Sequence, residues 1–152
     1  MQMETLRDVL HWTAEFHQHL AQCLSRCTDK NTSERARMML DYLSDHESEL
    51  SNVVRGFETS GEEHALNTWC LEYVNKHPIA RHLHSDSPFA DLEATQIMAV
   101  IANQHQQVIE LYRYLASRAD IPSARELLET LRSMEEHEMM RMAHSANRFD
   151  DM

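Results

Sequence analysis

Six histidine and glutamate residues lie on or beside apolar stripes of amphipathic segments, where a polar side chain without a partner is costly to bury. Imidazole nitrogen and carboxylate oxygen are ligands that iron, manganese and zinc all accept. The six are His17, His46, Glu47, His105, Glu135 and Glu138. Their types predict a metal site, provided that the chain folds so that they meet.

Helical rotation of about 100° per residue places four of these side chains toward a core. Around a stripe centred on Leu43, Glu47 lies about 40° and His46 about 60° from the centre. On the last helical segment, Glu138 lies about 20° and Glu135 about 40° from the centre of its stripe. Both segments are therefore predicted to turn two ligand-type residues inward.

The other two candidates, His17 and His105, each lie about 60° from a neighbouring apolar position. Chain turns near residues 30 and 121 place His17 opposite Ser44, close to His46 and Glu47. His105 falls opposite a point between Glu135 and Glu138. All six candidates are then expected at mid-height, in one layer of a bundle.

The elements that must position this layer are helices. The 152 residues, with only 2 Gly and 3 Pro, fit one domain (1–152) of long helices and leave few positions for tight hairpins. We expect an all-α fold: a four-helix bundle of two antiparallel helical hairpins, joined by a crossover that holds a short extra helix. The expected helices cover about residues 3–28, 32–57, 62–75, 88–118 and 123–149.

Local signals support this division and suggest an internal repeat. Asn31 with Glu34, and Ser123 with Glu126, match the spacing of a capping box at a helix start. The segment 43–47 resembles 134–138 at an offset of 91 residues, as expected if one hairpin had been duplicated.

The layer resembles the metal sites of the ferritin-like superfamily, the rubrerythrin-like di-iron bundles in particular, over the four long helices but not the crossover. That family has Glu on the first and third helices and Glu-x-x-His on the second and fourth. The matching positions here are His17, His46 with Glu47, His105, and Glu135 with Glu138. Glu135 and Glu138 are three residues apart, as in Glu-x-x-His, but Glu138 stands in the place of the histidine. The sequence contains no Glu-x-x-His. We expect this layer to hold one or two iron, manganese or zinc ions, with a redox or oxygen-related role if the metal is iron or manganese with an open coordination position.

The composition of the sequence disfavours several classes of function. The formal net charge of -11 disfavours nucleic-acid binding. We expect a soluble cytoplasmic protein with no membrane association, because the sequence has no run of 18 apolar residues and no basic-then-apolar leader, and its three cysteines suit reduced thiols. Gly56 and Gly61 are the only glycines, so no glycine-rich loop is present and no nucleotide cofactor is expected.

A second interpretation needs no metal. The same layer could be a buried ion-pair network that fixes the register of an interaction or regulatory module. Methionine-rich helix faces would then hold a protein partner or a second copy, and a homodimer is expected; the methionines concerned are Met38, Met39, Met139 and Met140. A hemerythrin-like site is less consistent with the sequence, because His11 and Glu15 lie on the outer face of their helix.

Overall fold

The computed structural model describes residues 4–68 and 87–150, and these residues form helices without a strand among them. Four helices are long: α1 (Leu6–Thr28), α2 (Glu34–Ser60), α6 (Ala94–Arg118) and α7 (Pro122–Asp150). Two are single turns, α3 (Glu63–Leu66) and α5 (Ser87–Ala90). The expected all-α four-helix bundle is confirmed.

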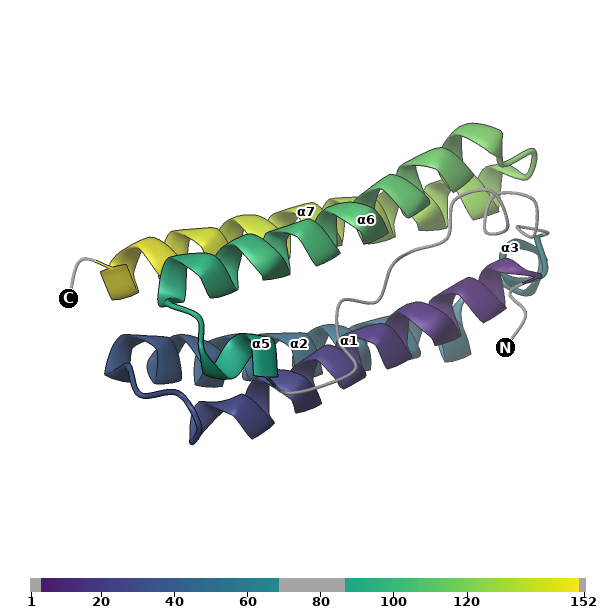
Figure 1. Cartoon of the computed structure of the whole chain (residues 1–152). Coiled ribbons are helices and arrows are strands. Elements are labelled where there is room, and N and C mark those ends of the chain that lie inside the picture. Colours follow the sequence, from purple (N-terminus) through teal and green to yellow (C-terminus); the bar gives the residue numbers. More distant parts are fainter. Residues whose placement is uncertain (1–3, 69–86, 151–152) are drawn as a thin grey trace.

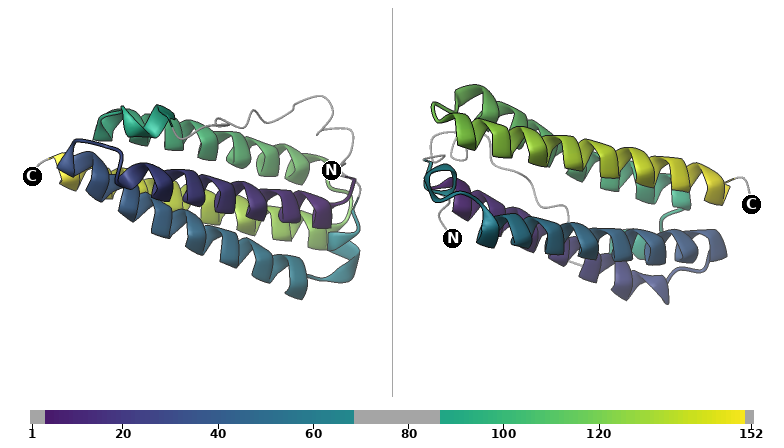
Figure 2. Two further views of the ribbon diagram at one scale, coloured as in Figure 1. Left: turned by 60° about the horizontal axis from the view of Figure 1, so that its bottom comes forward. Right: turned by 180° about the vertical axis from the view of Figure 1, so that it is seen from behind.

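The long helices form two antiparallel hairpins, α1 with α2 and α6 with α7 (Figure 1). The hairpins lie against each other along their length, and α2 contacts both α6 and α7 (Figure 2). Helix α2 ends and α6 begins at opposite ends of the bundle (Figure 1), as a crossover between hairpins requires. No helix in the described part of the chain is long and apolar enough to cross a membrane.

Helix starts differ from the predicted capping boxes. Ser33, not Asn31, caps α2, and its hydroxyl accepts a hydrogen bond from the Ala36 amide at 3.2 Å. The buried Asn31 side chain instead donates to the backbone carbonyls of Phe89 and Leu92, at 3.0 and 2.9 Å. Asn31 therefore ties the α1–α2 turn to the start of the second hairpin, a long-range role that local spacing does not reveal.

The start of α7 differs in the same way. The helix begins at Pro122, whose fixed φ suits the first helical position, so Ser123 already lies inside the helix. Its hydroxyl donates to the carboxylate of Glu62 at 2.9 Å instead of capping the helix. This contact joins α7 to the N-terminal cap of α3.

The crossover region divides differently from the expected helices. The segment 88–118 is two helices, because Glu93 caps α6 and its amide donates to the Gln96 side chain at 2.9 Å. Helix α3 covers only Glu63–Leu66 of the expected 62–75, and residues 69–75 lie outside the described part.

The internal repeat has an offset of 88 residues, not 91. Helices α1 and α6 begin at Leu6 and Ala94, and α2 and α7 begin at Glu34 and Pro122, so both pairs of starts are 88 residues apart. A difference of three residues is close to one helical turn of 3.6 residues, so both offsets superpose one apolar stripe on the other. The helix starts decide between them.

Candidate metal centre

Each long helix contributes one side chain to a closed cycle at the centre of the bundle. His17 Nδ1 lies 2.6 Å from Glu47 Oε2, and His17 Nε2 lies 2.6 Å from Glu135 Oε1. On the other side, His105 Nδ1 lies 2.9 Å from Glu135 Oε2, and His105 Nε2 contacts Glu47 Oε1. All four residues are 0% exposed. We call these four residues the His–Glu ring.

The repeat of the two hairpins explains why the ring closes. His17 and His105 are 88 residues apart, and so are Glu47 and Glu135, the same offset as the helix starts. Equivalent positions on α1 and α6 therefore supply the imidazoles, and equivalent positions on α2 and α7 supply the carboxylates. The ring has approximate twofold symmetry as a result.

Apolar side chains from all four long helices enclose the ring. Phe16 meets the His17 ring edge-on, with 5.6 Å between the ring centroids. One turn away on each helix lie buried residues of the hydrophobic core, namely Leu20, Leu43, Val108 and Leu131. The ring is thus surrounded by a medium in which an uncompensated charge would be strongly unfavourable.

The electrostatics of the ring reflect this enclosure. Burial by itself lowers the pKa of a histidine, but the carboxylates of Glu135 and Glu47 outweigh it and raise the pKa of His17 to about 9. The same competition raises the pKa of His105 to about 10. Burial by itself raises a carboxyl pKa, yet the two histidines lower the pKa of Glu47 and of Glu135 to about 2.

The hydrogen-bonding capacity of the ring is matched one to one. Two protonated imidazoles offer four N–H donors, and two ionised carboxylates offer four oxygens, each of which faces one ring nitrogen. The charges of the ring then sum to zero. Without an ion, the four residues form a self-contained ion-pair network.

The same atoms fit a metal ion. One ligand atom each from His17, Glu47 and His105 lies within 4.8 Å of the other two. Imidazole with carboxylate is a donor set for iron, manganese or zinc. Both nitrogens of each histidine face carboxylates, so an ion bound to one nitrogen would replace one of these contacts. The contact at the other nitrogen would remain and would fix the tautomer of the metal-bound histidine. The buried His17, Glu47 and His105 could therefore hold a metal.

The structure separates the remaining two predicted residues from the ring. His46 Nδ1 lies 3.2 Å from Glu138 Oε2, and Arg141 donates to Glu138 Oε1 at 2.7 Å. The side chains of His46 and Glu138 are 13% and 16% exposed, and the His46 ring lies against Tyr42 with 4.3 Å between centroids. We call His46 and Glu138 the outer pair. Four of the six predicted residues thus meet in the ring, and two meet beside it.

The hydroxyl of Tyr112 is not among the six candidates predicted from the sequence, because an aromatic residue at apolar helical spacing is expected simply to fill the core. The side chain is 0% exposed, and its oxygen lies near the hydroxyl of Thr13 without the geometry of an ordinary hydrogen bond. Burial raises its pKa well above the ordinary value, and the charge of Glu135 raises it further. Tyr112 is therefore a neutral, buried donor next to the ring.

Other chemistry-bearing residues lie apart from the ring. Cys23 and Cys27 are buried thiols, and Cys70 lies outside the described residues. His11 faces outward and contacts Glu15 and Glu58, each at 3.1 Å, so it belongs to no inward pair of the hemerythrin-like kind.

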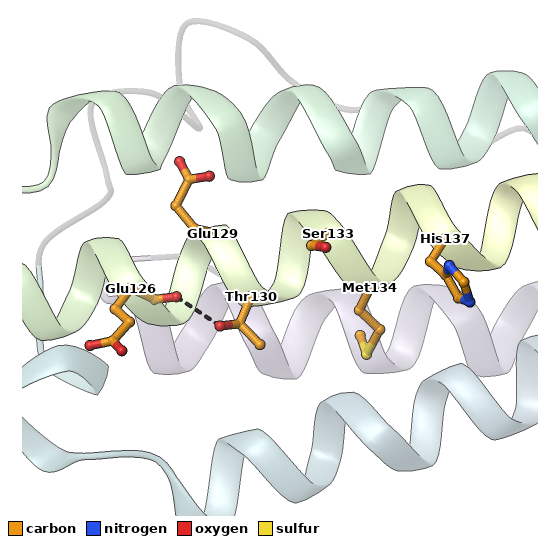
Figure 3. Close-up of a pocket in the computed structure, with 6 residues that line it drawn as sticks. All are labelled: Glu126, Glu129, Thr130, Ser133, Met134 and His137. Carbon is orange, nitrogen blue, oxygen red and sulfur yellow. Dashed lines mark hydrogen bonds between the residues drawn. The ribbon is translucent and has the colours of Figure 1, made fainter.

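A surface hollow of about 570 Å³ lies along one face of α7 (Figure 3). Its lining residues are Glu126, Glu129, Thr130, Ser133, Met134 and His137. None of them belongs to the ring, although Glu135 is carried by the same helix. His137 is exposed.

Comparison with known proteins identifies the class of fold. No protein-family model and no curated protein matches the sequence. Among solved structures, the chain is similar to a protein of Thermotoga maritima described as a ferritin-like diiron-carboxylate protein, with a TM-score of 0.65 over 97% of each chain. The two sequences are 11% identical, so the likeness concerns the fold. The protein has the ferritin-like fold, which confirms the fold expected from the resemblance to that superfamily.

Proposed function

We propose that this protein binds a first-row transition metal ion at the His–Glu ring. The observation that carries the proposal is the cluster of His17, Glu47 and His105, which is fully buried and has ligand atoms within 4.8 Å of one another. Glu135 contacts both histidines from the fourth helix and would complete the donor set. The ferritin-like neighbour, described as a diiron-carboxylate protein, supports the assignment of a metal to this layer.

The chain's own residues would divide the work of holding the ion. One nitrogen of each histidine would bind it, and the other would donate to a carboxylate and keep the imidazole oriented. The surrounding core residues would exclude water from the ligands. Bound iron or manganese would supply one-electron redox chemistry, and we propose a redox or oxygen-related role on that basis.

Elemental analysis tests this proposal. The protein is purified without an affinity tag or a chelator from media supplemented with iron, manganese or zinc. We expect at least one ion per chain in one of the three preparations, and its loss in Glu135→Gln. Less than about a tenth of an ion per chain in all preparations would reject a metal function.

A metal-free interaction or regulatory module is the second candidate, and the one-to-one match of donors and acceptors in the ring favours it. The ring would then fix the pairing of the hairpins, and exposed methionines would serve the contact with a partner or a second copy. Met140 is 68% and Met38 37% exposed, whereas Met39 is buried in the core and is unavailable for such a contact. Sedimentation analysis of Met140→Lys would test the homodimer. A change from dimer to monomer is expected, and an unchanged state would remove this surface from consideration.

We place either function in a reducing compartment, the cytoplasm. The supporting observation is that Cys23 and Cys27 are present as thiols within the core.

A further inference from the structure

We infer that the ring is built for a single divalent ion and that the outer pair takes no part in holding it. This inference rests on the proposed metal function and states how many ions the centre takes and from which residues. It follows from the charges and donors of the described residues, independently of how many ions similar folds hold.

The charge of the ring matches one divalent ion. If an ion replaces one of the two ring protons on each imidazolium, the two histidines are neutral and Glu47 and Glu135 supply two negative charges. One divalent cation then makes the buried centre neutral. A second would leave two positive charges without partners among side chains that are 0% exposed, where such charges are strongly unfavourable.

The number of available ligand atoms also favours a single ion. A single zinc, manganese or iron ion takes about four to six ligand atoms, which two imidazoles and two carboxylates can provide. A second ion would need additional ligands one turn along α2 and α7, beside Glu47 and Glu135. The residue three positions after Glu47 is Leu50, which is buried and has no donor.

The corresponding residue on α7 is Glu138, and its charge is already compensated. Arg141 donates to one carboxylate oxygen at 2.7 Å, and His46 contacts the other at 3.2 Å. Its side chain is also 16% exposed, whereas the ring carboxylates are 0% exposed. Glu138 therefore does not supply the additional buried negative charge that a second ion would require.

Counting ions at saturation tests the inference directly. The full chain is stripped with a chelator, titrated separately with Zn²⁺, with Mn²⁺ and, without oxygen, with Fe²⁺, and measured by elemental analysis and native mass spectrometry. We expect one ion per chain. Glu135→Gln and Glu138→Gln make the same chemical change one helical turn apart. Glu135→Gln is expected to weaken binding at least tenfold, and Glu138→Gln to leave both stoichiometry and affinity within about twofold.

The outcomes separate this inference from the proposed function. Two ions per chain in the unmodified protein would overturn the single-ion inference and leave the metal function intact. One ion that is lost in Glu138→Gln but kept in Glu135→Gln would place the ion at the outer pair and also overturn it. No ion in the unmodified protein would reject both. Because the count is made on the unmodified chain, a variant that fails to fold does not remove the test.

A gain-of-site variant tests the charge argument from the opposite direction. His17→Glu combined with His105→Glu gives the ring four carboxylates, whose charge matches two divalent ions. We expect this variant to take two ions per chain. A folded, metal-loaded variant that still takes one ion would show that charge does not set the number.

Discussion

The ring and the outer pair contain the same two residue types, lie next to each other on α2 and within one turn on α7, and yet have different environments. Glu135 and its ring partners are 0% exposed, whereas the side chains of His46 and Glu138 are 13% and 16% exposed. Each ring residue has two partners within the cycle, while Glu138 is shared between a histidine and the exposed side chain of Arg141. Closure and burial, not residue type, separate the two sites.

The physical reason for the difference is access to water. Near the surface, solvent screens an ion pair, and such a pair contributes about 0–1 kcal/mol to stability. In the core, each charge depends on its partners, so the loss of one leaves another uncompensated. Four predictions test this contrast, from the largest expected effect to the smallest.

The largest effect is expected when one ring carboxylate is removed from the metal-free protein. Glu135→Gln deletes one of two negative charges that face both imidazoles. We expect the free energy of unfolding in urea to fall by about 3–5 kcal/mol. A loss below about 1 kcal/mol would mean that water reaches the ring and that it resembles the outer pair.

Raising the pH should weaken the same network. The pKa values of His17 and His105, about 9 and about 10, lie above the ordinary 6.5, so folding favours their protonated forms. Their contribution is complete below about pH 6.5 and is lost as pH rises through about 9 to 10, at up to roughly 1.4 kcal/mol per pH unit for each histidine.

The carboxylates determine how the stability of the ring changes at low pH, because the pKa values of Glu47 and Glu135 are lowered to about 2. Their contribution is complete above about pH 4.5 and is lost as pH falls toward 2. Unfolding titrations of chelator-treated protein from pH 5 to 9 should therefore show a maximum near pH 5 to 6.5. A profile that stays flat up to pH 9 would contradict the double-imidazolium ring.

Replacing all four ring residues together should not destabilise the metal-free protein, in contrast to the loss of one carboxylate. The fourfold variant His17→Leu, Glu47→Leu, His105→Leu and Glu135→Leu removes all the buried charges together and leaves none without a partner. Because desolvation of a buried ion pair offsets much of its attraction, we expect metal-free stability to be unchanged or to rise by about 1–4 kcal/mol. Thermal unfolding with a chelator measures this, and a cooperative loss of the fold would show that the ring is required to align the hairpins.

The smallest effect is expected at the outer pair. Glu138→Gln removes a carboxylate that water already reaches, so the free energy of unfolding should change by less than about 1 kcal/mol. The same urea titration as for Glu135→Gln gives a matched comparison. Equal losses in the two variants would remove the distinction between ring and outer pair.

Much of the bundle could be predicted from the sequence, because scarce Gly and Pro together with a 3.6-residue apolar period define long amphipathic helices. The predicted positions of His17 and Glu47 across the first hairpin agree with their 2.6 Å contact. Counting back from a turn works here because both helices rise by the same amount per residue. The capping residues were less predictable, since Asn31 and Ser123 bond to distant segments.

The rotation of α7 shows the limit of a helical wheel. Measured from Leu131, the wheel places Glu138 nearer the centre of the stripe than Glu135, yet Glu135 is the buried residue. Leu128, Glu135 and Met142 are all buried and spaced by seven residues, the period of helices that wind around one another. Leu131 and Glu138 are also seven residues apart, so a wheel angle by itself does not show which of the two lines the neighbouring helices cover.

The sequence by itself determined the helices, their pairing into hairpins and the six polar residues that face the core, because these depend on local period and turn spacing. Only the tertiary structure divided the six into a closed ring of four and an outer pair. That division depends on how four helices approach, which sets the side-chain contacts and the access of water. The same contacts fix the charge of the ring, since each pKa depends on partners carried by other helices.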